Sequence, residues 1–148
     1  MNKTKTIFIS GLIAGTLDAV AAILLFAKPP NLHNISMVFR FIASGLLGNT
    51  AYSSGIIYPL AGILLHYLIA VIWSASYLFV LYRVFKSGSV WAKTILFASL
   101  IWIIMNGFVM PLCGLSSVRF DGWSVMSSFL VLLVCVSLPV CLIVEKKI

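Results

Sequence analysis

Three strongly polar side chains lie inside long apolar stretches of this sequence: Asp18, His66 and Asn106. Each stretch is long enough to form a helix that crosses a lipid bilayer. On insertion scales, an Asp near the centre of such a helix costs about 2.5–3.5 kcal/mol. We therefore expect Asp18 to face other helices, where a polar partner or water compensates its charge.

The residues around Asp18 and His66 indicate which helix faces point inward. Small residues surround Asp18 at helical spacing: Gly11, Ala14, Gly15, Ala21 and Ala22. A stripe of small and aromatic residues shares the face of His66: Gly62, Ala70, Trp73 and Tyr77. Because small residues let membrane helices approach closely, both faces are predicted to pack inside a helix bundle.

Depth in the membrane makes His66 the predicted partner of Asp18. Asp18 lies nine residues before the end of its apolar stretch at 27, and His66 lies nine after the start of its own at 57. At about 1.5 Å per residue, both lie about 13 Å deep from the same side. Asn106 lies about 9 Å deep by the same measure. Arg40 precedes the second stretch and could reach down to this group.

Three interpretations of these polar residues stay open. In the first, they form a pocket open to the outer side that binds a small polar ligand or exchanges protons. In the second, Asp18 and His66 only fix how the helices dock, with Asn106 as an interhelical hydrogen-bonding group. In the third, the pair serves an intramembrane enzyme as acid and base. Trp73, Tyr77 and Trp102 are candidates for lining the pocket, although packing is their commoner role.

The composition requires a membrane protein. Of 148 residues, 62% are apolar and 9% are charged, whereas about a quarter of the residues of a soluble domain are charged. A transmembrane helix takes about 20 residues, so four spans and their loops fill the chain. We therefore predict an all-α integral membrane protein with one four-helix transmembrane domain over residues 1–148.

The predicted spans cover residues 7–27, 57–82, 94–112 and 124–144. The first could be taken for a signal peptide because Lys3 and Lys5 precede it. However, Leu25 is not the small residue that a cleavage site requires, and Asp18 would interrupt the apolar core of the signal. We expect this segment to be retained as a span.

A short amphipathic segment over residues 35–48 connects the first two spans. Its apolar residues share one helical face: Phe39, Ile42, Ala43 and Leu46. At about fourteen residues it is too short to cross the bilayer. We therefore predict a helix that lies in the outer interface or re-enters the membrane.

Positive charges predict the orientation. Seven lie at the N-terminus, in the second loop and at the C-terminus: Lys3, Lys5, Arg83, Lys86, Lys93, Lys146 and Lys147. Three lie in the first and third loops: Lys28, Arg40 and Arg119. The positive-inside rule then places both termini in the cytoplasm. The net charge of +7 is spread around the apolar stretches, which predicts contacts with membrane lipids and none with nucleic acid.

The cysteines predict neither a metal site nor a cofactor. Cys113, Cys135 and Cys141 have no metal-binding spacing, and two of them fall inside the last predicted span. Buried Cys commonly serves as a small apolar residue.

Five segments distributed over the four predicted spans carry a family resemblance. They are GLIAGTLD at 11–18, RFIASGLLG at 40–48, LHYLIA at 65–70, MN at 105–106 with PL at 111–112, and SLP at 137–139. In these segments the chain resembles a group of small bacterial four-span inner-membrane proteins without an assigned function. The resemblance implies the architecture and a bacterial inner membrane, but no activity. Members often carry His near the position of Cys135, and this chain departs from that pattern.

The sequence thus predicts a four-helix membrane bundle with a polar site formed by Asp18, His66, Asn106 and Arg40. Binding or passage of a small polar solute or a proton is the leading functional hypothesis. A structural or partner-binding membrane protein is the alternative, and a homo-oligomer is compatible with either.

Overall fold

The computed structural model describes residues 2–84, 88–115 and 122–147, and this part of the chain is helical almost throughout, without a β-strand. Four helices are long and apolar enough to cross a membrane: Lys3–Phe26, Ile57–Val84, Val90–Leu112 and Gly122–Lys147. The prediction of an all-α, multi-pass membrane protein is confirmed. These four helices are called spans one to four below.

Three of the spans are built from consecutive helical segments. Span one is α1 (Lys3–Phe26). Span two comprises α3 (Ile57–Ser76), the π-helix η2 (Tyr77–Leu81) and α4 (Tyr82–Val84). Span three comprises α5 (Val90–Ile104), the π-helix η3 (Met105–Val109) and α6 (Met110–Leu112). Span four comprises α7 (Gly122–Val131), the π-helix η4 (Leu132–Ser137) and α8 (Leu138–Lys147).

The helices continue beyond the apolar stretches that predicted them. The largest differences are at the starts of spans one and three, which the sequence placed at 7 and 94. Asn2 caps α1 by accepting a hydrogen bond from the N–H of Thr4 at 3.4 Å, and Ser89 caps α5 through the N–H of Ala92 at 3.2 Å. Capping side chains satisfy the free N–H groups of a helix start, so helical hydrogen bonding extends into the charged ends.

Two of the π-helices end two residues before a proline. The N–H of Met110 bonds to the carbonyl of Met105, and the N–H of Leu138 bonds to that of Leu133. Pro111 and Pro139 follow, and neither has an N–H to continue the α-helical pattern. A proline and a π-segment are both recognised causes of local helix widening and kinking, which accounts for the irregular geometry of spans three and four here.

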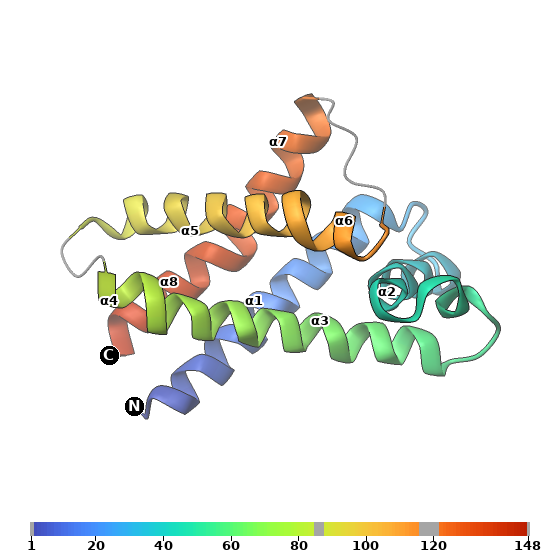
Figure 1. The fold of residues 1–148 in the computed structure, drawn as a ribbon, viewed down its shortest axis with the longest axis horizontal. Coiled ribbons are helices and arrows are strands. Elements are labelled where there is room, and N and C mark those ends of the chain that lie inside the picture. Colours follow the sequence, from blue (N-terminus) through green and yellow to red (C-terminus); the bar gives the residue numbers. More distant parts are fainter. Residues whose placement is uncertain (1, 85–87, 116–121, 148) are drawn as a thin grey trace.

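Both ends of the described chain, α4 and the start of α5 lie at one end of the bundle, here called the termini end (Figure 1). The opposite end, called the α2 end, holds α2 (Leu32–Leu47), which is seen almost end-on while the four spans lie closer to the plane of the picture (Figure 1). The helix predicted at 35–48 therefore crosses the end of the bundle. It is followed by the short 3-10 helix η1 (Gly48–Tyr52).

Close contact between α1 and α3 depends on glycine and serine. A Cβ on Gly11 would lie 2.8 Å from the Cα of Val71, and one on Gly15 would lie 3.0 Å from the ring of Tyr67. In the same interface, the buried hydroxyls of Ser10 and Ser74 are 2.6 Å apart. Small residues and interhelical hydrogen bonds are the usual means of packing membrane helices.

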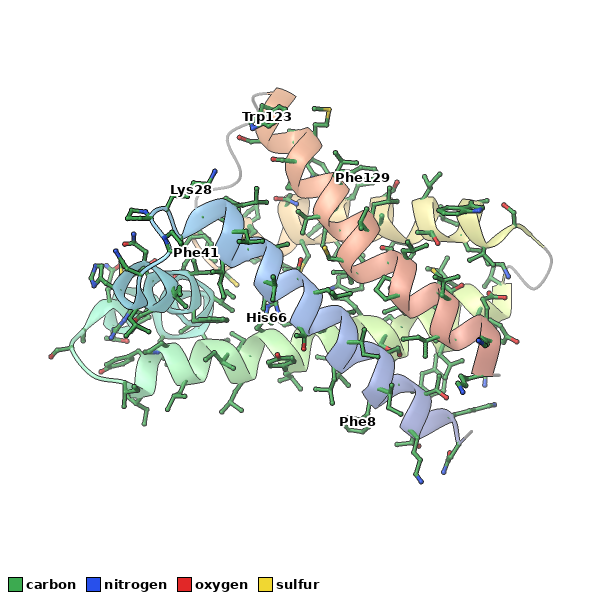
Figure 2. All side chains as sticks on the ribbon, turned by 180° about the vertical axis from the view of Figure 1, so that it is seen from behind. Phe8, Lys28, Phe41, His66, Trp123 and Phe129 are labelled. Carbon is green, nitrogen blue, oxygen red and sulfur yellow. The ribbon has the colours of Figure 1, made fainter. Side chains whose placement is uncertain are left out.

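The buried apolar core is concentrated toward the termini end. It joins residues from all four spans: Ile7, Ala14, Tyr77, Leu78, Leu81, Phe97, Ile101, Val136, Val140, Cys141 and Val144. Many large apolar side chains elsewhere face outward, such as Phe8, which points away from the bundle in Figure 2. An outward apolar surface is what a lipid environment requires.

The backbone of α2 packs directly against Gly62 of α3. A Cβ at this position would lie 2.6 Å from the carbonyl carbon of Phe39 in α2, and closer still to its oxygen. We predict that Gly62→Ala lowers the free energy of unfolding in detergent by about 1–3 kcal/mol or more, because backbone must move. Gly107→Ala is the matched control, since a Cβ there meets nothing within 4 Å. Equal stability of the two variants would contradict this packing.

Candidate functional site

A cavity of about 220 Å³ lies between spans one, three and four. Three of its lining side chains are polar: Asp18, Asn106 and Ser128. The others are apolar: Ala22, Leu25, Phe26, Met105, Met110, Val131 and Leu132. Two lining residues, Met105 and Asn106, belong to η3, and Leu132 begins η4. The cavity therefore lies where the two proline-linked π-helices face α1.

The structure brings Asp18 and His66 together across α1 and α3. The Nε2 atom of His66 is 4.0 Å from Oδ2 of Asp18, and the side chains are 11% and 25% exposed, respectively. The same Nε2 atom is only 2.8 Å from the backbone carbonyl of Gly15, to which it donates its hydrogen. At 4.0 Å, the contact with Asp18 is electrostatic and not a hydrogen bond. Figure 2 shows His66 between α1 and α3 in the middle of the bundle.

Asn106 and Ser128 meet at Trp102. The amide Nδ2 of Asn106 donates to the carbonyl of Trp102 at 3.0 Å. The indole Nε1 of Trp102 donates to the hydroxyl of Ser128, also at 3.0 Å. Ser128 in turn donates to the carbonyl of Val125 at 3.0 Å. Trp102, predicted as a pocket residue, thus holds the two polar side chains at the cavity wall.

Arg40 lies in a different environment from the rest of the predicted site. Its guanidinium donates to the carbonyls of Ala51, at 2.9 Å, of Ser53, and of Gly55, at 2.7 Å. It also lies over the ring of Tyr58, 5.8 Å from the ring centre. Arg40 therefore holds the connection after α2 to the start of α3, and its charge does not contact Asp18.

Trp73 and Tyr77 pack in the apolar core and do not line the cavity. Their rings lie 6.3 Å and 5.1 Å from that of Phe97, between ring centres. Tyr77 is fully buried. These two aromatic residues take the packing role that the sequence left as the alternative.

A buried polar cluster near the termini end is absent from the sequence predictions. The Nζ of Lys93 lies 2.8 Å from Oε1 of Glu145, and the hydroxyl of Tyr77 donates to the same oxygen at 3.0 Å. The Lys93 side chain is only 5% exposed. The prediction placed Lys93 in a loop because a charge normally marks the end of a span. Comparing depths would have revealed the pair, since Lys93 starts span three on the side where Glu145 ends span four.

Cys135 lies near Asp18, close enough for the two groups to interact electrostatically. Cys141 lies beside Tyr77 and Thr94 near the Lys93–Glu145 pair. Among the described residues, no group of three or more His, Cys, Asp or Glu side chains is placed to hold a metal ion.

No family model, curated protein or solved structure matches this chain. The chemistry of the site therefore has to be inferred from its geometry. One carboxylate, one amide and one hydroxyl face a cavity with otherwise apolar walls. Such a cavity can bind water, a proton carrier or a small solute with a polar group and an apolar body.

We predict that Asp18 and His66 are energetically coupled. Asp18→Asn and His66→Gln should each lower the thermal stability in detergent, and the double variant should lose less than the two losses summed. For contacting groups the coupling is about 0.5–3 kcal/mol, and the 4.0 Å distance favours the lower end. The measurement is a double-mutant cycle on unfolding free energies.

A second cycle, His66→Gln with Ser99→Ala, provides the control. The Ser99 hydroxyl bonds to the carbonyl of Ile95 in its own helix, so these two losses should add. If the Asp18–His66 cycle is equally additive, the pair is not coupled.

Proposed function

We propose that this protein binds a small polar solute or a proton at the Asp18 cavity and allows it to pass into or across the membrane. The observation that supports the proposal is an acidic side chain at membrane depth facing a cavity. Ionisable residues inside membrane spans mark solute and ion pathways in many membrane proteins.

The shape of the bundle supports access from the α2 end. The cavity lining on α1 runs from Asp18 to Phe26, a distance of about 12 Å at 1.5 Å per residue. Beyond Asp18 toward the termini end, the apolar core fills the bundle. The pair of Lys93 and Glu145 lies past that core. In a transport cycle, the geometry would correspond to a state open at the α2 end and closed at the termini end.

A structural role is the alternative, and one contact favours it. The hydrogen bond from His66 to the carbonyl of Gly15 joins α3 to α1, as would be expected of a residue that sets helix packing. This function would account for His66. It would leave the cavity beside Asp18 unexplained.

The charge distribution supports an orientation in a bacterial inner membrane with both termini in the cytoplasm. Of the eight Lys and Arg residues that the structure describes, six belong to segments at the termini end: Lys3, Lys5, Arg83, Lys93, Lys146 and Lys147. Lys86 and Arg119, which the sequence assigned to the second and third loops, lie outside the described residues. Positive residues favour the cytoplasmic side. Lys28 lies at the opposite, α2 end (Figure 2). On this proposal the cavity opens toward the periplasm.

Water in the cavity can be tested by thiol labelling. Val131 lines the cavity, whereas its neighbour Leu130 is 47% exposed on the outside of the bundle. We predict that, with the three native Cys replaced, Val131→Cys reacts about tenfold or more faster than Leu130→Cys with a small charged methanethiosulfonate, because a thiolate forms only in water. Equal, slow labelling of both would mean a dry cavity and would refute the proposed function.

The orientation predicts opposite accessibility at positions 31 and 88. In the same cysteine-replaced background, Asn31→Cys should be labelled by an impermeant reagent added outside intact cells. Gly88→Cys should be labelled only after the membrane is permeabilised, because it belongs to the cytoplasmic side. Labelling of 88 and not 31 in intact cells would reverse the proposed topology.

A further inference from the structure

We infer that the cavity binds a small organic cation, specifically a primary ammonium group carried on a short apolar body. This inference rests on the proposed function, since it names the ligand class of the same cavity. Three features carry it: the hydrogen-bonding state of the polar side chains, the charge of Asp18, and the apolar walls.

The polar side chains at the cavity present hydrogen-bond acceptors. The Ser128 hydroxyl uses its hydrogen on the carbonyl of Val125 and accepts from Trp102, which leaves a lone pair. Asn106 uses an amide hydrogen on the carbonyl of Trp102, so its carbonyl oxygen stays available. Asp18 supplies carboxylate oxygens. A ligand that pairs with these acceptors must donate hydrogen bonds. A primary ammonium group has three donors and no acceptor.

Asp18 lacks a hydrogen-bond donor in the described part of the chain. His66 lies within 4.0 Å, but its Nε2 hydrogen is directed at the carbonyl of Gly15, 2.8 Å away. A carboxylate in a low-dielectric site needs both charge compensation and donors. A ligand that brings a positive charge and N–H groups supplies both at once.

The walls select for an organic cation over a metal ion. Calcium requires six to eight oxygen ligands and magnesium about six, whereas three polar side chains line this cavity. The remaining surface comes from groups such as Phe26, Met105 and Met110. These side chains fit the apolar body of an alkylamine or arylalkylamine. Met is especially suited to a variable ligand shape because its chain is flexible.

Four matched probes test the inference on the full-length protein in lipid nanodiscs: butylamine, butan-1-ol, butyrate and butyltrimethylammonium. They share one apolar chain and differ in charge and in donor groups. We expect butylamine to raise the thermal unfolding midpoint saturably, because a ligand that binds the native state stabilises it. The other three should have little effect at the same concentration and ionic strength.

Variants assign the effect to the cavity. Asp18→Asn should weaken butylamine binding roughly ten- to hundredfold, the loss expected for a charge-assisted hydrogen bond. Asn106→Leu keeps the charge and should weaken it by a smaller factor, about two- to tenfold. Asn106→Leu also tests the assignment to the cavity if Asp18→Asn does not fold. Ser99 belongs to the same span as Asn106, but its hydroxyl bonds to its own helix. The Ser99→Ala variant should therefore bind butylamine like the wild type.

The other outcomes distinguish failure of the ammonium inference from failure of the proposed function. Equal stabilisation by butyltrimethylammonium would contradict the requirement for N–H donors. Equal stabilisation by butan-1-ol or butyrate would contradict the requirement for a positive charge. If no probe has an effect while Val131→Cys is labelled, the ammonium inference fails and a water-filled or proton-binding cavity stands. If Val131→Cys is also unreactive, both the inference and the proposed function fail.

Discussion

The constraint on which this structure depends is that hydrocarbon offers polar groups no hydrogen bonds, so each must find a partner inside the protein. The backbone meets it by forming helices. Some side chains meet it within their own helix, as Ser99 does. Others form contacts that join the spans, such as Ser10 with Ser74 and His66 with the carbonyl of Gly15. These contacts need close helix approach, which explains why glycines occupy the interface of α1 and α3. In this interface, hydrogen bonding between the helices therefore depends on the close packing that small residues allow.

The sequence predicted those features that a helical pattern and membrane depth determine. The four spans, the short helix at the end of the bundle and the proximity of Asp18 to His66 follow from apolar stretches and rise per residue. Arg40 does not reach Asp18 because it bonds to the carbonyls of Ala51 and Gly55, which lie closer along the chain. The predicted depth of a residue in the membrane does not reveal such local acceptors. The π-helices were not predicted, because apolar periodicity does not distinguish a π-helix of five or six residues from the α-helix around it. Ser128 was not among the predicted site residues, because a Ser hydroxyl in a helix commonly bonds to its own backbone. It does so here while also lining the cavity.

Each end of the bundle handles its charges differently. At the α2 end, the positive charge of Arg40 is spread over backbone carbonyls and a tyrosine ring. At the termini end, Lys93 and Glu145 neutralise each other under the apolar core. Both arrangements are closed, with the charged groups meeting partners of the same chain. Neither needs a ligand, and both hold together elements distant in sequence.

Glu145 and Asp18 provide an internal comparison between two acidic side chains of one membrane protein. One oxygen of Glu145 receives a bond from Lys93 at 2.8 Å and another from Tyr77 at 3.0 Å, as expected of a carboxylate with a structural role. Asp18 lies deeper, has an imidazole 4.0 Å away that bonds elsewhere, and faces a cavity instead of a donor. A carboxylate kept only for packing would gain stability from the kind of partners that Glu145 has. The unmet hydrogen-bonding capacity of Asp18 is thus a cost to the fold, and a ligand or proton that enters the cavity is the group that can offset it.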